Sequence, residues 1–531
     1  MYEKLKFSNL RNLYLFIFYL VNKFLNLINF RKDLWGYDFK ILDGESFKNK
    51  ILVFCPSLSL DKPSYLNVGI KALINTAKYK NINIDLIQCQ KSLAICHLGG
   101  SPFSYKNKMP CLSCTSINKR LYKDTNIIKL ENIKKNDEND LENLSLEELL
   151  KYNYKGFELG KLATSSIIWI KRTPLLDKKD VGYFKKIIKD SIGLIDYFEG
   201  LNLKDYSAVL VFNGASFPES ILYEFCKKQN INVATFEGGL SYKNKFSIEF
   251  NYGITAQHRF KFDQSLDFNS TDLFEDPNLM KTQYVDGENV KENYFDKKKV
   301  LNINGKKIVS VFGNVSWDTS QYISNTIFLS MFDWLESLKE LIKSNPDYLF
   351  IFRAHPGENR RLKKTFYGMG QWLEDNNIQD FENAIIVNSD DKIDSYEIIN
   401  KSNLVLVYNS TIGIESTMMG KKSYVAASTH YSDQPFVMNF NSKQAYIEQL
   451  KTDLKTENFK ISETMIQLSK SYYYQLFNHV SYSLDNLIIK ADGKQLEVKN
   501  DLIDDRKYLL NSQFNNLLEN LINNRNIQAI S

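Results

Sequence analysis

The sequence predicts an α/β protein with two domains, each built on a parallel sheet covered by helices. Short apolar, β-branched segments alternate with segments of helical periodicity from about residue 50 to about residue 430. The alternation occurs twice, on either side of a polar, turn-rich stretch at residues 262–300. Short loops between such segments are typical of parallel strands joined by crossover helices. We therefore expect two Rossmann-like domains with a cleft between them.

Composition limits the possible functions. Of 531 residues, 43% are hydrophobic and 24% are charged, as in folded soluble proteins. The 68 basic and 62 acidic residues leave a net charge of only +6, which argues against a general nucleic-acid binder. Six cysteines are too few for a disulfide scaffold, so a cytoplasmic protein is expected.

The amino terminus has a pattern of its own. Residues 1–40 hold seven basic and three acidic residues, so they carry +4 of the net charge. The apolar run at residues 13–21 is shorter than the roughly 20 residues of a membrane-spanning helix, and no signal-peptidase site follows it. We expect an amphipathic helix on the anionic inner face of the cytoplasmic membrane, with the protein peripheral there. A helix that packs on the protein's own body explains the pattern equally well.

The first domain is expected at residues 41–290. A polar insertion at residues 122–155, with one helix at 144–152, interrupts its alternation of strands and helices. The expected strands lie at residues 50–58, 81–89, 207–214 and 232–239, and the expected helices at 68–78, 176–200 and 218–229.

After a linker near residues 285–303, a second domain is expected at residues 300–440 and a helical region at 441–531, which returns to brace the first domain. The expected strands of the second domain lie at residues 306–314, 348–356, 384–389, 403–411 and 422–428, and its helices at 327–343, 395–400 and 412–420. Ligands bind such sheets at the carboxyl ends of the strands.

Two loops of the second domain carry candidate phosphate ligands. Gly313 and Asn314, with Ser316, follow the first strand, where a glycine allows close approach and free amides can bind an anion. Arg353 and His355 end the next strand, and they suit bidentate phosphate binding and proton transfer. An ordinary surface turn would explain either loop alone.

A third loop begins a helix. Ser410 and Thr411 can cap this helix while their hydroxyls face an anion, and Glu415 can accept hydrogen bonds from a ribose. A simple capping box is compatible with this function. The three loops together predict a site for a nucleotide monophosphate or diphosphate sugar.

These motifs resemble a known family. The Arg-x-His-Pro turn followed by Asn409-Ser-Thr-x-Gly-x-Glu looks like the donor-binding half of GT-B glycosyltransferases of the bacterial capsule polysaccharide type, relatives of Kdo- and sialic-acid-transferring enzymes. The resemblance covers about residues 205–430 and includes Asn213-Gly214 and the segment 235–239. It implies that Glu237 is the general base, that His355 binds phosphate, and that Ser410, Thr411 and Glu415 hold the nucleotide. Some relatives carry a paired acid at the base and a hydroxyl in place of Asn409.

Sugar transfer with inversion needs one carboxylate to deprotonate the acceptor hydroxyl and a counter-charge on the leaving phosphate. Glu237 could instead be a capping or loop carboxylate. Because Arg353 and His355 can neutralise the phosphate, no metal is required at the catalytic site.

Four cysteines suggest a separate metal site. Cys89, Cys96, Cys111 and Cys114 lie within 26 positions and end in a C-x2-C pair, which could hold a structural zinc ion. Buried free thiols are the alternative, as expected for Cys226.

The sequence thus predicts a glycosyltransferase that moves a sugar from a CMP- or UDP-sugar to a glycan or lipid-linked acceptor during capsule or surface polysaccharide synthesis. A polyol-phosphate transferase, a sugar-nucleotide 2-epimerase and a catalytically silent assembly scaffold remain as alternatives. The sugar, the base, the linkage and the oligomeric state stay open.

Overall fold

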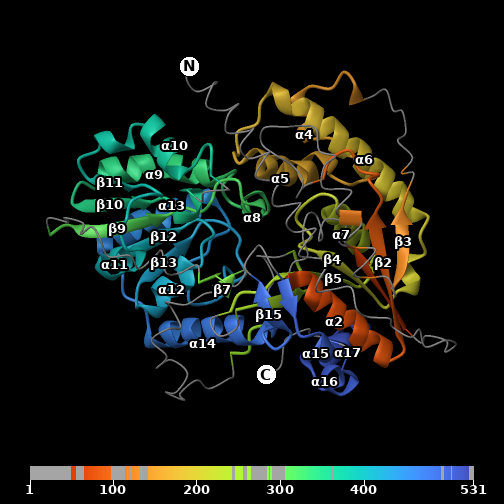
Figure 1. Cartoon of the computed structure of the whole chain (residues 1–531). Helices are drawn as coiled ribbons and strands as arrows, with labels where there is room; N and C mark the ends of the chain where they lie inside the picture. Colours follow the sequence, from red (N-terminus) through yellow and green to blue (C-terminus); the bar gives the residue numbers. More distant parts are fainter. Residues whose placement is uncertain are drawn as a thin grey trace.

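A computed structural model describes most of the chain after residue 48. The described residues are 49–54, 65–96, 114–115, 118, 122, 125–131, 133, 141–241, 245–254, 260–264, 284–285, 288–289, 305–359, 364–491, 496–503 and 505–525. The expected helix at residues 1–40 and most of the expected linker lie outside them. Two α/β domains stand side by side, each built on its own sheet (Figure 1). No helix within the described ranges is both long and apolar enough to cross a membrane.

The first domain contains a seven-stranded sheet in the order β14-β6-β5-β4-β1-β2-β3. Strands β1 to β5 are parallel, and β6 and β14 are antiparallel additions at one edge. The parallel part therefore has the doubly wound order 3-2-1-4-5, with its switch point between β1 and β4. The strands are β1 (Asn49–Phe54), β2 (Ile82–Cys89), β3 (Asn126–Leu130), β4 (Ala208–Phe212), β5 (Val233–Gly238), β6 (Ser247–Asn251) and β14 (Ser481–Ser483).

Helices cover both faces of this sheet because its strands are apolar on both sides. Ile51 and Val53 enter one core with α2 (Tyr65–Tyr79), whereas Leu52 and Phe54 enter the other. The second core is completed by α4 (Leu146–Leu150), α5 (Leu159–Lys171), α6 (Val181–Glu199) and α7 (Glu219–Lys228).

The second domain has a parallel five-stranded sheet in the order β11-β10-β9-β12-β13, again 3-2-1-4-5. Its switch point lies between β9 and β12. The strands are β9 (Lys307–Phe312), β10 (Tyr348–Arg353), β11 (Ala384–Val387), β12 (Leu404–Val407) and β13 (Lys422–Val425). The helices are α8 (Thr319–Ser324), α9 (Met331–Ser344), α10 (Met369–Asp375), α11 (Ser395–Lys401), α12 (Ile412–Met418), α13 (Lys443–Thr456) and α14 (Glu463–His479).

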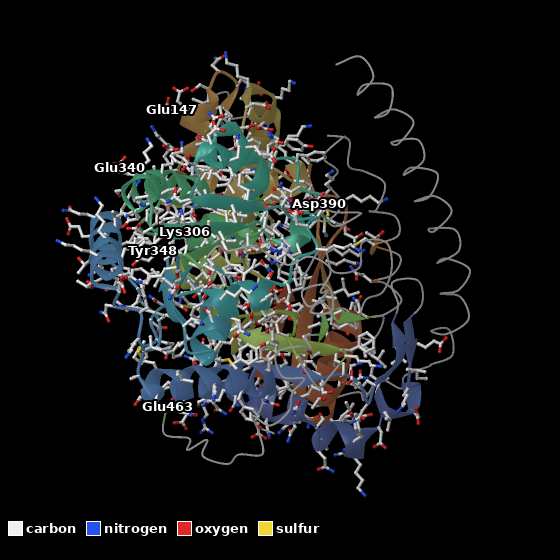
Figure 2. The ribbon with its side chains drawn as sticks, turned by 90° about the vertical axis from the view of Figure 1, so that its left-hand side faces the viewer. Glu147, Lys306, Glu340, Tyr348, Asp390 and Glu463 are labelled. Carbon is white, nitrogen blue, oxygen red and sulfur yellow. The ribbon has the colours of Figure 1, made fainter. Side chains whose placement is uncertain are left out.

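The last part of the chain returns to the first domain, as the sequence predicted. Helix α14 packs on the second domain through Tyr472 and Tyr473 and leads into β14, which pairs with β6. Glu463, where α14 begins, lies low in the molecule, and Glu147 of α4 lies at its upper edge (Figure 2). The helices that follow, α15 (Asn500–Ile503), α16 (Arg506–Leu510) and α17 (Gln513–Ile522), lie beside α2. Short strand pairs form at β15–β16 (Ile488–Ala491, Leu496–Val498) and β7–β8 (Tyr284–Val285, Glu288–Asn289).

The predicted fold class of two parallel-sheet domains is confirmed. Three strands of the first sheet were not expected from the sequence. Residues 126–130 lie in the expected polar insertion but pair with β2 as an edge strand, whose partly exposed position tolerates polar residues. Strands β6 and β14 are short; β6 pairs with β5, which precedes it in the sequence, whereas β14 is held by β6, more than 200 positions away.

Candidate functional site

The loops after β9 and β12 meet at the switch point of the second sheet. The Asn314 side-chain amide donates to Asn409 Oδ1 at 2.9 Å, and Gln321 Nε2 donates to the same oxygen at 2.7 Å. Asn409 Nδ2 in turn donates to Ser324 Oγ at 3.2 Å. The network holds both loops in one arrangement at the strand ends, where a ligand of this fold is expected.

Gly313 and Ser316 shape the first of these loops. A side chain at Gly313 would collide with Met369 Sδ, so glycine is needed for close packing. Ser316 is buried and donates to the main-chain oxygen of Tyr367 at 2.7 Å. Gly313 and Ser316 therefore stabilise the conformation of this loop. Its contact with an anion stays a prediction.

His355 lies half-buried after β10. The main-chain N–H of Gly357 donates to His355 Nδ1 at 2.9 Å, so the neutral imidazole carries its proton on Nε2. A side chain at Gly357 would also lie 3.3 Å from Val315 Cγ2. The histidine loop is thus adjacent to the loop after β9.

Arg353 does not fit the predicted phosphate contact. It is only 3% exposed, and its guanidinium donates to main-chain oxygens of Asn388, Asp391 and Ile393 and to Ser395 Oγ. These bonds fix the loop after β11. Because guanidinium donors engaged in this way do not reach a ligand, we correct the prediction and regard Arg353 as a structural residue.

Glu415 likewise does not fit contact with a ribose. The residue is fully buried, and its two carboxylate oxygens accept hydrogen bonds from Tyr396 at 2.9 Å and Tyr473 at 3.3 Å. Tyr473 lies on α14, which the sequence did not place here. Glu415 therefore links α11, α12 and α14, and this prediction is corrected too.

Ser410 and Thr411 lie where α12 begins. Ser410 Oγ accepts from the main-chain N–H of Ile412 at 3.3 Å, and the buried Tyr431 hydroxyl donates to the Ser410 carbonyl oxygen. Thr411 is the N-cap residue, yet its side chain makes no capping bond. The half-buried Thr411 hydroxyl is thus not used by the helix.

Glu237 ends β5 in the first domain. Its Oε2 accepts from the Asn213 side-chain amide at 2.5 Å, and Asn213 itself adopts a left-handed conformation with φ 57° at the end of β4. Leu240, three residues further, packs against the apolar cluster of α12 and α14. The half-buried carboxylate therefore lies at the carboxyl end of β5, three residues before a side chain that packs on the second domain.

A second carboxylate accompanies Glu237. Glu249 lies directly opposite it in the antiparallel β5–β6 pair, so both side chains are on the same face, and Glu249 is 1% exposed. Sequence analysis missed Glu249 because it did not predict β6. The alternation Ser-Ile-Glu-Phe-Asn at residues 247–251 was the signal that could have revealed the strand.

The zinc hypothesis concerns residues that are only partly described. Cys89 and Cys96 are half-buried, Cys114 is buried, and Cys111 lies outside the described residues. Within the described ranges no group of three or more His, Cys, Asp or Glu residues is placed to hold a metal ion. The four-thiolate site stays a prediction. Cys226 is a buried free thiol whose pKa is raised by burial to about 12, consistent with a core residue.

Two further ionisable residues lie beside these loops and were not singled out from the sequence. Glu358 follows His355 and is 5% exposed, and burial raises its pKa to about 7 although the main-chain N–H of Met369 donates to it. Arg172, at the end of α5, contacts Trp317 in the loop after β9. Nothing in the local sequence distinguishes either one.

Comparisons with known proteins add little to this geometry. No family model and no curated protein matches the chain. Among solved structures, the beta Kdo 2,4 transferase KpsC of Thermosulfurimonas dismutans is similar at a TM-score of 0.33 and 11% identity, over 58% of this chain and 88% of that chain. The beta Kdo 2,7 transferase of the same KpsC is similar at a TM-score of 0.28 and 16% identity, over 56% of this chain and 83% of that chain. The UDP-GlcNAc 2-epimerase of Neisseria meningitidis is similar at a TM-score of 0.25 and 12% identity, over 81% of this chain and 97% of that chain. Such low TM-scores support no inference about activity.

Proposed function

We propose that the protein is a glycosyltransferase that moves a sugar from a nucleotide-activated donor to a glycan or lipid-linked acceptor. The observation that supports this most directly is the joined pair of loops at the β9–β12 switch point, linked by Asn314 and Asn409. Switch points of doubly wound sheets are where nucleotides bind. His355, Ser410 and Thr411 border the same strand ends and offer donors to a phosphate.

In the proposed reaction, Glu237 takes the proton from an acceptor hydroxyl. The acceptor oxygen then forms a bond to the anomeric carbon while the bond from that carbon to the leaving phosphate oxygen breaks. The Nε2–H of His355 donates to the leaving phosphate, and the Asn213 amide orients the base. In this scheme the developing charge is stabilised by hydrogen bonds from His355 and from the hydroxyls of Ser410 and Thr411, and the proposal includes no catalytic metal.

The donor is a CMP- or UDP-sugar in this proposal, and the pathway is capsule or surface polysaccharide synthesis. The protein would act at the inner face of the cytoplasmic membrane, held there by residues 1–40. The basic and aromatic composition of that segment supports peripheral attachment.

Variants of both domains test the assignment. His355→Ala and Ser410→Ala should each weaken binding of the cognate donor by roughly 10- to 150-fold, the effect of losing a hydrogen bond to a charged group. Glu237→Gln should nearly abolish turnover and leave donor affinity unchanged. Glu199→Gln, on the exposed end of α6, is the matched control. Unchanged donor affinity in both second-domain variants would refute the nucleotide site.

An epimerase remains the second candidate because Glu237 and Glu249 lie opposite each other. The half-buried Glu237 can remove and return a proton at a sugar carbon, with the buried Glu249 beside it. The two functions separate cleanly in one experiment. Incubation with UDP-N-acetylhexosamine alone should give no C2 epimer, and solvent deuterium at C2 would favour the epimerase.

A further inference from the structure

Arg172 is a buried cation at the junction of the two domains. It is 9% exposed, and its Nη1 has no hydrogen-bond partner within the described part of the chain. The structure gives no hydrogen bond to the rest of its guanidinium either, considering the described residues alone. Burial lowers the pKa of Arg172 to about 10, against the opposing effect of Asp318, so the side chain is still charged at neutral pH.

Two tryptophans hold the guanidinium. Arg172 Cζ lies 4.0 Å from the ring centre of Trp169 on α5 and 4.3 Å from that of Trp317 in the loop after β9. The two indole rings meet at 82°, so they form a corner around the cation. Indole faces attract a cation but accept no strong hydrogen bond. The N–H groups on the edge of the guanidinium therefore lack the acceptors that a buried arginine normally has.

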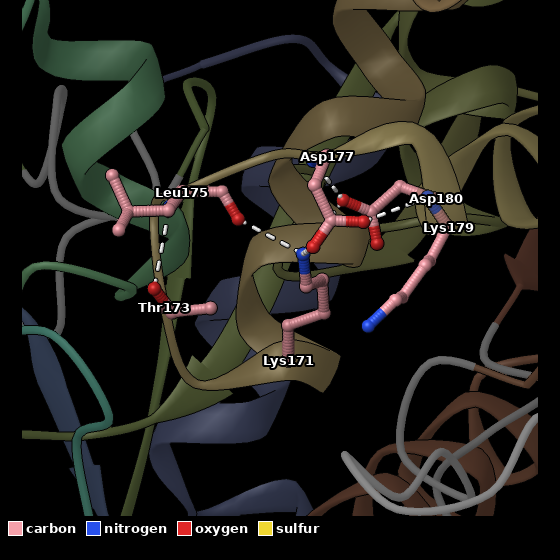
Figure 3. Close-up of polar contacts among 6 residues, drawn as sticks. All are labelled: Lys171, Thr173, Leu175, Asp177, Lys179 and Asp180. Atoms are coloured by element: carbon pink, nitrogen blue, oxygen red, sulfur yellow. Dashed lines mark hydrogen bonds and ion pairs between the residues drawn. The ribbon is translucent and has the colours of Figure 1, made fainter.

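Arg172 has an unusual main-chain conformation. It ends α5 in a left-handed conformation, φ 59°, which is unfavourable for a side chain with a Cβ. The turn after α5 is held in place, because Lys171 Nζ binds the fully buried Asp180 carboxylate at 2.6 Å and the Leu175 carbonyl at 2.9 Å (Figure 3). Asp180 also accepts from the main-chain N–H of Asp177 at 2.7 Å.

The second domain contributes the other half of this junction. The main-chain N–H of Phe366 donates to the Arg172 carbonyl oxygen at 2.9 Å. Trp317 Nε1 donates to Thr365 Oγ1 at 2.8 Å, which fixes the indole that contacts the guanidinium. The main-chain N–H of Thr365 in turn donates to the Glu358 carbonyl at 2.8 Å, in the histidine loop. Arg172 is thus connected to the loop after β9 and to the histidine loop.

Asp318 is the nearby acid, but it has another task. Its Oδ1 accepts from the main-chain N–H of Ser320 at 2.9 Å and caps α8. Its carboxylate reduces the unfavourable charge of Arg172 without occupying the guanidinium edge. The edge still lacks an anion.

We propose that Arg172 is an anion-binding residue contributed by the first domain, and that its ligand is a phosphate oxygen of the donor at the domain junction. The identity of the ligand rests on the proposed function, whereas the existence of an anion site does not. A guanidinium whose Nη1 has no acceptor among the described residues can still donate to an anion, and guanidinium groups bind phosphate in a bidentate manner. Anion binding would also tie Trp169 and Trp317, and hence the two domains, together.

The test measures binding of inorganic pyrophosphate, CMP, UDP and GDP to the full chain by calorimetry. Arg172→Gln should weaken binding of at least one of these probes tenfold or more. Arg172→Lys should rescue little, because an ammonium lacks the planar edge. Uridine and cytidine, which have no phosphate, should bind both forms equally. Arg506→Gln, on α16 far along the chain from the junction, is the control and should leave all affinities unchanged.

The outcomes separate the two proposals. Pyrophosphate binding that depends on Arg172, without any nucleotide binding, keeps the anion site and rejects the glycosyltransferase. Nucleotide affinity unchanged in Arg172→Gln overturns the anion site and leaves the proposed function standing. A variant that lowers only the thermal midpoint shows that Arg172 merely joins the domains. Failure of the wild-type protein to bind any probe overturns the anion site as well.

Discussion

Replacing Glu358 by glutamine should make the protein more stable at alkaline pH. The carboxyl group is buried beside the histidine loop, and its one described hydrogen bond comes from the main-chain N–H of Met369 at 3.1 Å. Burial raises its pKa to about 7, against an ordinary value of 4.5. Glutamine keeps an oxygen for Met369 and cannot ionise.

The direction in which stability changes with pH follows from proton binding to Glu358. Between pH 4.5 and 7 the folded protein holds a proton on Glu358 that the unfolded chain has released, so stability falls as pH rises through this window. The difference between the two pKa values corresponds to about 3 kcal/mol, fully lost above pH 7. We therefore expect Glu358→Gln to exceed the wild type by up to about 3 kcal/mol at pH 8, and by a small part of that at pH 5.

Urea unfolding monitored by tryptophan fluorescence at the two pH values measures this difference. Glu340→Gln is the control, because Glu340 lies exposed on α9 (Figure 2). A Glu358→Gln variant whose advantage is the same at pH 5 and pH 8 would refute the reasoning. So would a variant less stable than the wild type at pH 8.

Three further outcomes are expected. Lys171→Met should lower the free energy of unfolding by about 3–5 kcal/mol in urea titrations, since it leaves the Asp180 carboxylate buried without its cation. Gly413→Ala should be destabilising by up to about 2 kcal/mol in thermal unfolding, because the new methyl group would lie 3.0 Å from ring carbons of buried Tyr431, a clash of about 1–3 kcal/mol that exceeds the gain in helix propensity of about 1. A chain without residues 1–35 should stay folded and bind nucleotide in calorimetry, yet leave the membrane fraction on sedimentation; aggregation would favour a helix packed on the protein.

The parallel sheets could be predicted from sequence because strands buried on both faces are continuous apolar segments. Residues 348–353 and 404–407 are such segments, and every residue of both is buried. The antiparallel edge could not be predicted in the same way. Strand β14 has three residues and exists because residues 245–251 offer it a partner more than 200 positions away.

The sequence predicted that the candidate loops are neighbours, but not the partners of their residues. Strand ends and the switch point follow from topology, so the loops after β9, β10 and β12 were found correctly as neighbours. Whether a polar side chain points to a ligand or into the protein depends on remote elements. Tyr473 on α14 donates a hydrogen bond to the Glu415 carboxylate, and the guanidinium of Arg353 donates to the loop after β11. Arg172 also depends on a remote element, because Trp317 of the other domain covers part of its guanidinium.

The return of the chain to the first domain has a consequence for biosynthesis. Leu517, Leu518 and Leu521 of α17 lie in the same core as α2, and the Asn75 side chain donates to the Ile503 carbonyl at 2.9 Å. During translation the second domain is complete some tens of residues before these segments leave the ribosome. Until then the first domain exposes the apolar face of α2 and the unpaired edge of β6. Such features recruit chaperones and promote aggregation. Ribosome-bound chains halted after α14 has emerged but before β14 has emerged should therefore hold a folded second domain and a protease-sensitive first domain. The sheet that contains Glu237 would then be complete only after β14 has been synthesised and has paired with β6.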